Sequence, residues 1–169
     1  MNDPAFPFIS AIVIGLGATL TFDMWGHWLK HAFNIPPSNI CVVGRWLRYM
    51  PEGTFKHANI ASTPPQSAEC AVGWIAHYMI GITFALVFVG FVGDDWLQHP
   101  TPLPAIVFGT ITVLAPFAIM HPFFGFGFAA AKTPNPAQAR VRSLMNHMAF
   151  GAGLYFFALL VTWLPAAFG

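Results

Sequence analysis

Four apolar stretches alternate with polar connections along the chain, and each stretch is about as long as a membrane-spanning helix. They cover roughly residues 8–29, 71–92, 103–120 and 143–164. A helix needs about 20 apolar residues to cross the hydrocarbon core of a bilayer. The pattern therefore predicts an all-α integral membrane protein, with four transmembrane helices in one bundle and residues 1–169 forming one domain.

Small and polar residues recur at every fourth position within these stretches. The first span carries Ala11, Gly15, Thr19, Asp23 and His27 at this spacing. The second span carries Glu69, Gly73, His77 and Gly81. Residues four apart share one face of a helix, and small residues let membrane helices approach closely. We therefore expect these faces to contact other helices rather than lipid.

The connection between the first two spans, residues 30–68, is long for a loop without structure of its own. Between Pro37 and Pro51 it has an amphipathic pattern, with Arg45 and Arg48 placed away from the centre of the apolar face. The apolar positions are Ile40, Val43, Trp46, Leu47 and Met50. This pattern predicts a helix lying in the cytoplasmic membrane interface. The helix either anchors the loop or forms a lid over a polar pocket, and amphipathicity alone favours the anchor.

Composition supports the membrane class. The chain is 56% hydrophobic and 8% charged, whereas about a quarter of the residues in a soluble domain are charged. The formal net charge of +1 gives no indication of nucleic-acid binding. The expected partners are the lipid bilayer, an unknown small-molecule ligand and, in one alternative, further copies of the chain.

The basic residues predict an orientation. All of them lie in two connections, namely Lys30, Arg45, Arg48, Lys56, Lys132, Arg140 and Arg142. The positive-inside rule places both connections in the cytoplasm and both termini in the periplasm. The segment before the first span lacks a side-chain cation, so we expect that span to be retained rather than cleaved as a signal peptide. Cys41 and Cys70 would then face a reducing compartment, where we expect no disulfide.

Ionisable residues within the spans indicate a site. This orientation brings Asp23 and a histidine from every span to the inner third of the membrane. The histidines are His27, His77, His121 and His147. A charged group in hydrocarbon is costly and is a functional candidate by default. We therefore predict catalytic roles for Asp23 and Glu69 and cofactor-binding roles for the four histidines.

The chemistry of this site stays open at the sequence level. Imidazole ligands suit haem iron and transition metals, so one hypothesis is a redox protein with a bound cofactor. The alternative is a small proton-coupled transporter or oligomeric channel in which the carboxylate and histidines carry protons. The third hypothesis is a structural or accessory subunit, in which the polar groups only hold helices together. The di-iron Glu-x-x-His and zinc-protease His-Glu-x-x-His patterns are absent from the sequence.

Several short motifs resemble one bacterial family. They are Gly15-x-Gly17-Ala18-Thr19 followed by Asp23-x-Trp25, Gly44-Arg45-Trp46, Met50-Pro51-x-Gly53-x-Phe55, Glu69-x-x-x-Gly73-Trp74-x-x-His77-Tyr78, and Thr133-Pro134-Asn135-Pro136 leading to His147. Together they resemble domain of unknown function 2938, a family of uncharacterised bacterial inner-membrane proteins, over nearly the whole chain. The resemblance implies a location in the bacterial inner membrane and implies no activity.

Overall fold

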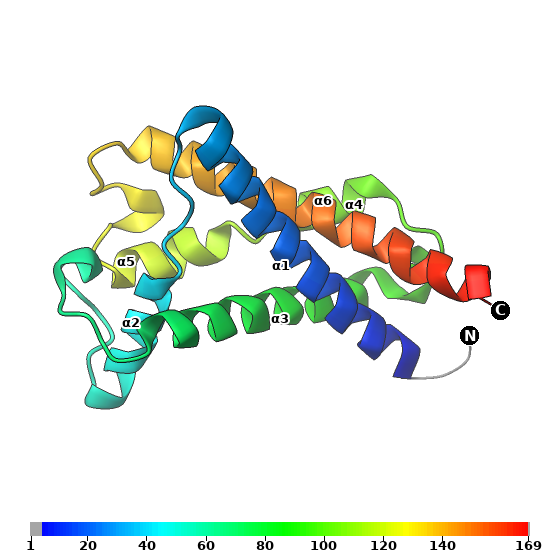
Figure 1. The fold of residues 1–169 in the computed structure, drawn as a ribbon, viewed down its shortest axis with the longest axis horizontal. Coiled ribbons are helices and arrows are strands. Elements are labelled where there is room, and N and C mark those ends of the chain that lie inside the picture. The colour runs from blue at the N-terminus through cyan, green and yellow to red at the C-terminus, as the bar shows by residue number, and fades with distance from the viewer. Residues whose placement is uncertain (1–4, 169) are drawn as a thin grey trace. The chain divides into compact units, whose positions relative to one another are not determined.

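The computed structural model describes the backbone of residues 5–168 and the side chains of residues 6–163, and this part of the chain is helical, without strands (Figure 1). The long helices are α1 (Ala5–Phe33), α3 (Glu69–Gln98) and α6 (Pro136–Phe168). The first loop contains α2 (Cys41–Tyr49), η1 (Met50–Glu52) and η2 (Ile60–Ser62). The remaining elements are α4 (Pro102–Ile111), η3 (Pro116–Met120), α5 (His121–Phe123) and η4 (Phe128–Ala130).

Four helical segments in the described part of the chain are long and apolar enough to cross a membrane. They are Phe6–Phe33, Glu69–Gln98, Pro102–Phe123 and Pro136–Trp163. Each contains most or all of one predicted span and extends beyond it. The all-helical class and the positions of the four apolar segments are therefore confirmed, and they are typical of a multi-pass membrane protein.

The third apolar segment is interrupted near its middle. Helix α4 ends at Ile111, and η3 begins at Pro116 as a π-helical turn. Proline has no N–H to donate and crowds the turn before it, so the regular α-helical pattern is disturbed at this point.

The chain forms two compact units, which we describe separately. Unit 1 comprises residues 1–37, 78–112 and 146–169, and unit 2 comprises residues 38–77 and 113–145. The core of unit 1 is built by α1, α3, α4 and α6. Its most completely buried large side chains are Ile14, Phe88, Leu97 and Leu154.

The small and polar face of α1 packs against α3 in unit 1. Ala11 and Thr19 are each 1% exposed. A Cβ atom at Gly15 would lie 3.1 Å from the Cβ atom of Ala85, and one at Gly81 would meet the hydroxyl of Thr19. That hydroxyl donates a hydrogen bond of 2.7 Å to the Gly15 carbonyl oxygen. The prediction that this face contacts another helix is confirmed for these residues.

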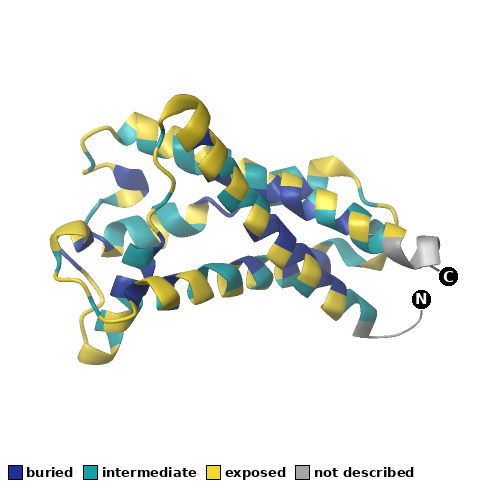
Figure 2. Cartoon of the chain, in the orientation of Figure 1, coloured by how far each residue is buried: buried dark blue, intermediate teal, exposed yellow. Residues whose placement is uncertain are grey.

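Exposed positions, drawn in yellow, recur along α1, α3 and α6 (Figure 2), and many of them carry large apolar side chains. Phe91 on α3 is 86% exposed, and Trp163 on α6 is 75% exposed. Such extended apolar surface is unusual on a water-soluble monomer and is typical of a surface that meets lipid.

In unit 2, α2 packs closely on the first turns of α3. A Cβ atom at Gly44 would meet the carbonyl oxygen of Glu69, and one at Gly73 would meet the carbonyl oxygen of Ile40. The helix predicted in the first loop is present, and Arg45 within it is only 9% exposed. The missing side chain at Gly44 lets the two backbones approach, so the neighbouring Arg45 is enclosed against α3.

Candidate functional site

A carboxylate and a tyrosine from two candidate membrane segments meet in unit 1. Asp23 lies on α1 and Tyr78 on α3, and both are partly buried. The Tyr78 hydroxyl donates a hydrogen bond of 3.1 Å to Oδ2 of Asp23. A hydroxyl group can both donate and accept a hydrogen bond, so it can pass a proton to a neighbour.

A histidine and a threonine form a second polar pair in the same unit. Nδ1 of His147 on α6 lies 2.7 Å from Oγ1 of Thr112, at the end of α4. The Thr112 hydroxyl can also donate to the Gly109 carbonyl oxygen, at 2.5 Å. Which of the two groups donates in the contact between Thr112 and His147 depends on the tautomer of the imidazole ring.

The two pairs are connected through Phe22, the residue before Asp23. Its ring meets the His147 ring edge-on, with 5.7 Å between the centroids. The described residues of unit 1 thus bring a carboxylate, a phenol, an imidazole and a hydroxyl into one region. Each of the four candidate membrane segments supplies one of these groups.

The other predicted histidines have different surroundings. His27 is exposed, and its Nδ1 lies 2.8 Å from the backbone carbonyl oxygen of Asp23. In unit 2, the ring of His77 contacts the ring of Trp74, and the ring of His121 contacts those of Phe117 and Phe126. Among the described residues, no three His, Cys, Asp or Glu side chains are placed to hold one metal ion.

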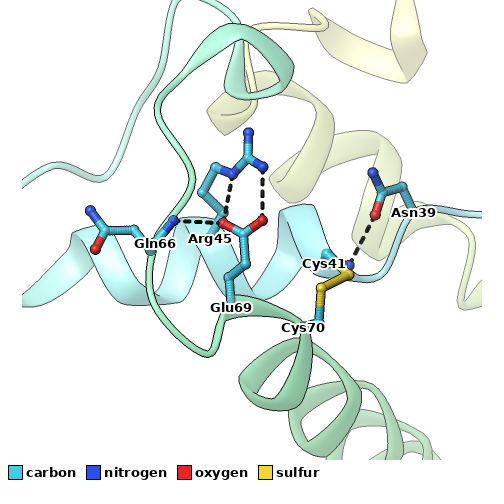
Figure 3. Close-up of a disulfide and its surroundings, with 6 residues drawn as sticks. All are labelled: Asn39, Cys41, Arg45, Gln66, Glu69 and Cys70. Atoms are coloured by element: carbon cyan, nitrogen blue, oxygen red, sulfur yellow. Dashed lines mark hydrogen bonds and ion pairs between the residues drawn. A yellow bond between two sulfur atoms is a disulfide. The ribbon is translucent and has the colours of Figure 1, made fainter.

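Glu69, predicted as a catalytic residue, forms an ion pair with Arg45 in unit 2 (Figure 3). Nε of Arg45 donates to Oε2 of Glu69 and Nη2 donates to Oε1, each at 2.8 Å. The backbone N–H of Gln66 also donates to this carboxylate. Nη1 of Arg45 donates to the backbone carbonyl oxygens of Ile60 and Thr63. Hydrogen bonding to Glu69 raises the pKa of Arg45 above its usual value. The arrangement favours a role in holding α2 and the loop on α3.

The prediction that the two cysteines stay reduced is wrong in the structure, which joins Cys41 and Cys70 in a disulfide (Figure 3). The prediction rested on the compartment, whereas the close packing of α2 on α3 brings the two Cα atoms within 4.0 Å. Disulfides persist mainly in oxidising compartments. The disulfide and the positive-inside rule therefore assign the same loop to opposite sides of the membrane.

Buried His57 predicts a pH dependence of stability in unit 2. Its residue is 7% exposed, its Nε2 has no hydrogen-bond partner, and burial lowers its pKa from 6.5. Below about pH 6.5 the imidazole of His57 is therefore protonated in the unfolded chain but resists protonation in the folded chain. The free energy of unfolding consequently falls as the pH falls through about 6.5. We expect a loss of about 1 kcal/mol between about pH 7.5 and about pH 5.5. Thermal unfolding of the detergent-solubilised protein at both pH values measures it.

The control for this prediction is a second histidine outside the core. The pH dependence should shrink in His57→Gln and persist in His99→Gln, since His99 is exposed. An equal pH dependence in wild type and His57→Gln would contradict the prediction.

Sequence reasoning missed the partners of the candidate residues rather than the residues themselves. Tyr78 and Thr112 were not singled out, although each is a polar residue inside an apolar segment. That signal alone marks both positions, but it does not say which acid or histidine each one meets. The pairing of Arg45 with Glu69 was not predicted, because placing Arg45 away from the centre of the apolar face does not say which acid it meets.

Comparison with known proteins adds a family and no activity. No curated protein and no solved structure matches the chain. The family described as protein of unknown function, DUF2938, matches residues 12–161. This range contains Asp23, Tyr78, Thr112 and His147 together with the Arg45–Glu69 pair. Because the match covers most of the chain, this protein belongs to the DUF2938 family.

Proposed function

We propose that this protein moves protons in the bacterial inner membrane through a site formed by Asp23, Tyr78, His147 and Thr112. The observation that carries the proposal is the placement of two titratable side chains in one unit, each in contact with a hydroxyl from a different apolar helical segment. Carboxylates and histidines inside membrane segments are the groups that proton relays use.

The geometry supports proton movement better than the cofactor hypothesis. A haem or metal site needs imidazole or other ligands directed at one centre, with their second nitrogens held by neighbouring groups. A neighbouring group holds Nδ1 of His147, as the second nitrogen of a ligand would be held, so this contact fits both hypotheses. The described residues do not gather a set of three metal-binding side chains.

Proton flux into vesicles tests the proposal. The purified protein is reconstituted into vesicles that enclose a pH-sensitive dye, and a potassium diffusion potential drives protons inward. Asp23→Asn should lower the rate of acidification by about tenfold or more, the scale of effect when a proton-transferring group is lost. Tyr78→Phe, which removes only the hydroxyl that donates to Asp23, should cause a smaller loss.

Asp95→Asn is the matched control, because Asp95 is an exposed acid at the far end of α3. Thermal stability of every variant separates loss of function from loss of fold. Wild-type vesicles without flux, or equal flux in wild type and Asp23→Asn, would contradict the proposal. A haem spectrum or bound metal that disappears in His147→Ala would favour the cofactor hypothesis instead.

The site is also compatible with the predicted location, which we carry forward as a proposal. Both termini are periplasmic if the basic loops are cytoplasmic. An alkaline phosphatase fusion after residue 169 should then be active. An inactive phosphatase fusion together with an active cytoplasmic reporter would reverse the orientation and agree with the compartment expected for the disulfide.

A further inference from the structure

An open groove lies between α1 and the second half of α3 in unit 1, away from the residues of the proposed proton site. Its volume is about 340 Å³, at the lower end of the range for small-molecule pockets. Helix α1 contributes Pro7, Phe8 and Ala11, and α3 contributes Val89, Gly90 and Asp94. The walls are apolar, apart from the carboxylate of Asp94.

The groove exists partly because glycines leave space along α3. A Cβ atom added at Gly90 or Gly93 would have no other atom within 4 Å. Gly93 has a φ of 75°, a conformation that favours glycine, and it interrupts the helix just before Asp94. The glycines therefore keep the groove open and set the position of the acid at its end.

The charge at this end is unbalanced within the described part of the chain. Asp94 and Asp95 are exposed, and neither forms an ion pair among the described residues. The connection between residues 93 and 102 contains no lysine or arginine. An apolar groove that ends at a carboxylate is complementary to a molecule with a hydrocarbon chain and a cationic group.

We propose that this groove binds a phospholipid with an ammonium headgroup, with one acyl chain beside Gly90 and the ammonium beside Asp94. Both helices belong to candidate membrane segments, so the surrounding bilayer supplies hydrocarbon chains directly. The carboxylate selects the headgroup, because it attracts an ammonium group and repels a purely anionic lipid. The proposal is independent of proton movement, since it uses none of the same residues.

Native mass spectrometry of the full-length protein tests this binding. The detergent-solubilised protein is mixed with equal amounts of phosphatidylethanolamine and phosphatidylglycerol, and the retained lipids are counted. Wild type should retain phosphatidylethanolamine preferentially. Gly90→Leu should lose this adduct because the side chain fills the groove, whereas Gly90→Ala should keep it.

The headgroup is tested separately with a matched pair of acids. Asp94→Asn should lower the preference for phosphatidylethanolamine by about two- to fivefold, the range expected for an exposed ion pair, and should leave total lipid binding in place. Asp95→Asn should have no such effect, because Asp95 does not line the groove. Folding of each variant is checked by its elution volume and thermal stability.

Results of two kinds would overturn the proposal. One is equal retention of both lipids by wild type, or an unchanged adduct in a folded Gly90→Leu protein. The other is a wild-type dimer that Gly90→Leu converts to a monomer without a change in lipid binding, which would assign the groove to a second copy of the chain.

Discussion

A Glu69→Gln protein should be destabilised by about 3 kcal/mol or more, because the change leaves the enclosed charge of Arg45 without its counter-ion. The side chains of this pair are 11% exposed, and Arg45 also holds the carbonyl oxygens of Ile60 and Thr63. Loss of the pair should therefore loosen the loop and the end of α2 that carries Arg45, while the Cys41–Cys70 disulfide still joins α2 to α3. Thermal unfolding in detergent measures the loss, which is seen as a lower melting temperature.

Glu52→Gln is the matched control for this change. Glu52 is an exposed acid in the same loop, so its neutral variant should unfold within about 0.5 kcal/mol of wild type. If the Glu69→Gln protein had the same melting temperature as the Glu52→Gln control, the ion pair would contribute little to the stability of the fold.

A Gly109→Val protein should lose a comparable amount of stability in unit 1. A Cβ atom at Gly109 would meet the backbone of Gly151, and one at Gly151 would lie 2.8 Å from the carbonyl oxygen of Ala105. Since backbone atoms line this contact, α4 and α6 must separate to admit the side chain. Overpacking of this kind costs about 1–3 kcal/mol, and we expect the upper end here.

The same separation should weaken the contact between Thr112 and His147, because Thr112 follows α4 directly and bonds to Gly109. Proton flux should therefore fall along with the melting temperature. Gly90→Ala is the control, since a Cβ atom there meets nothing within 4 Å. If Gly109→Val and Gly90→Ala unfolded at the same temperature, the close approach of α4 and α6 would be refuted.

The sequence was sufficient to predict the helices because their apolar runs are long and, apart from Asp23, carry no charged side chain. It also predicted the packed face of α1, since small residues at every fourth position have few other uses in a membrane helix. Asp23 could be selected as a site residue for a similar reason, because a carboxylate in an apolar run stands out by its cost.

Contacts between distant segments could not be predicted in the same way. The approach of α2 to α3 depends on Gly44 and Gly73, and glycine spacing alone does not say which helix fills the space. The disulfide and the enclosure of Arg45 both follow from that one approach. The hydrogen bond from Tyr78 to Asp23 joins residues 55 positions apart, beyond the reach of any local pattern.

The disulfide also determines how the protein should respond to a protease. Lys56 is exposed and lies inside the covalent ring that Cys41 and Cys70 close, so trypsin that cuts after Lys56 breaks the chain without separating its two parts. On a denaturing gel, protein that is cut only after Lys56 should run as one band without reductant and as two fragments with it. Because trypsin does not cross membranes, the same digestion on sealed vesicles of known orientation reveals which side of the membrane the ring occupies.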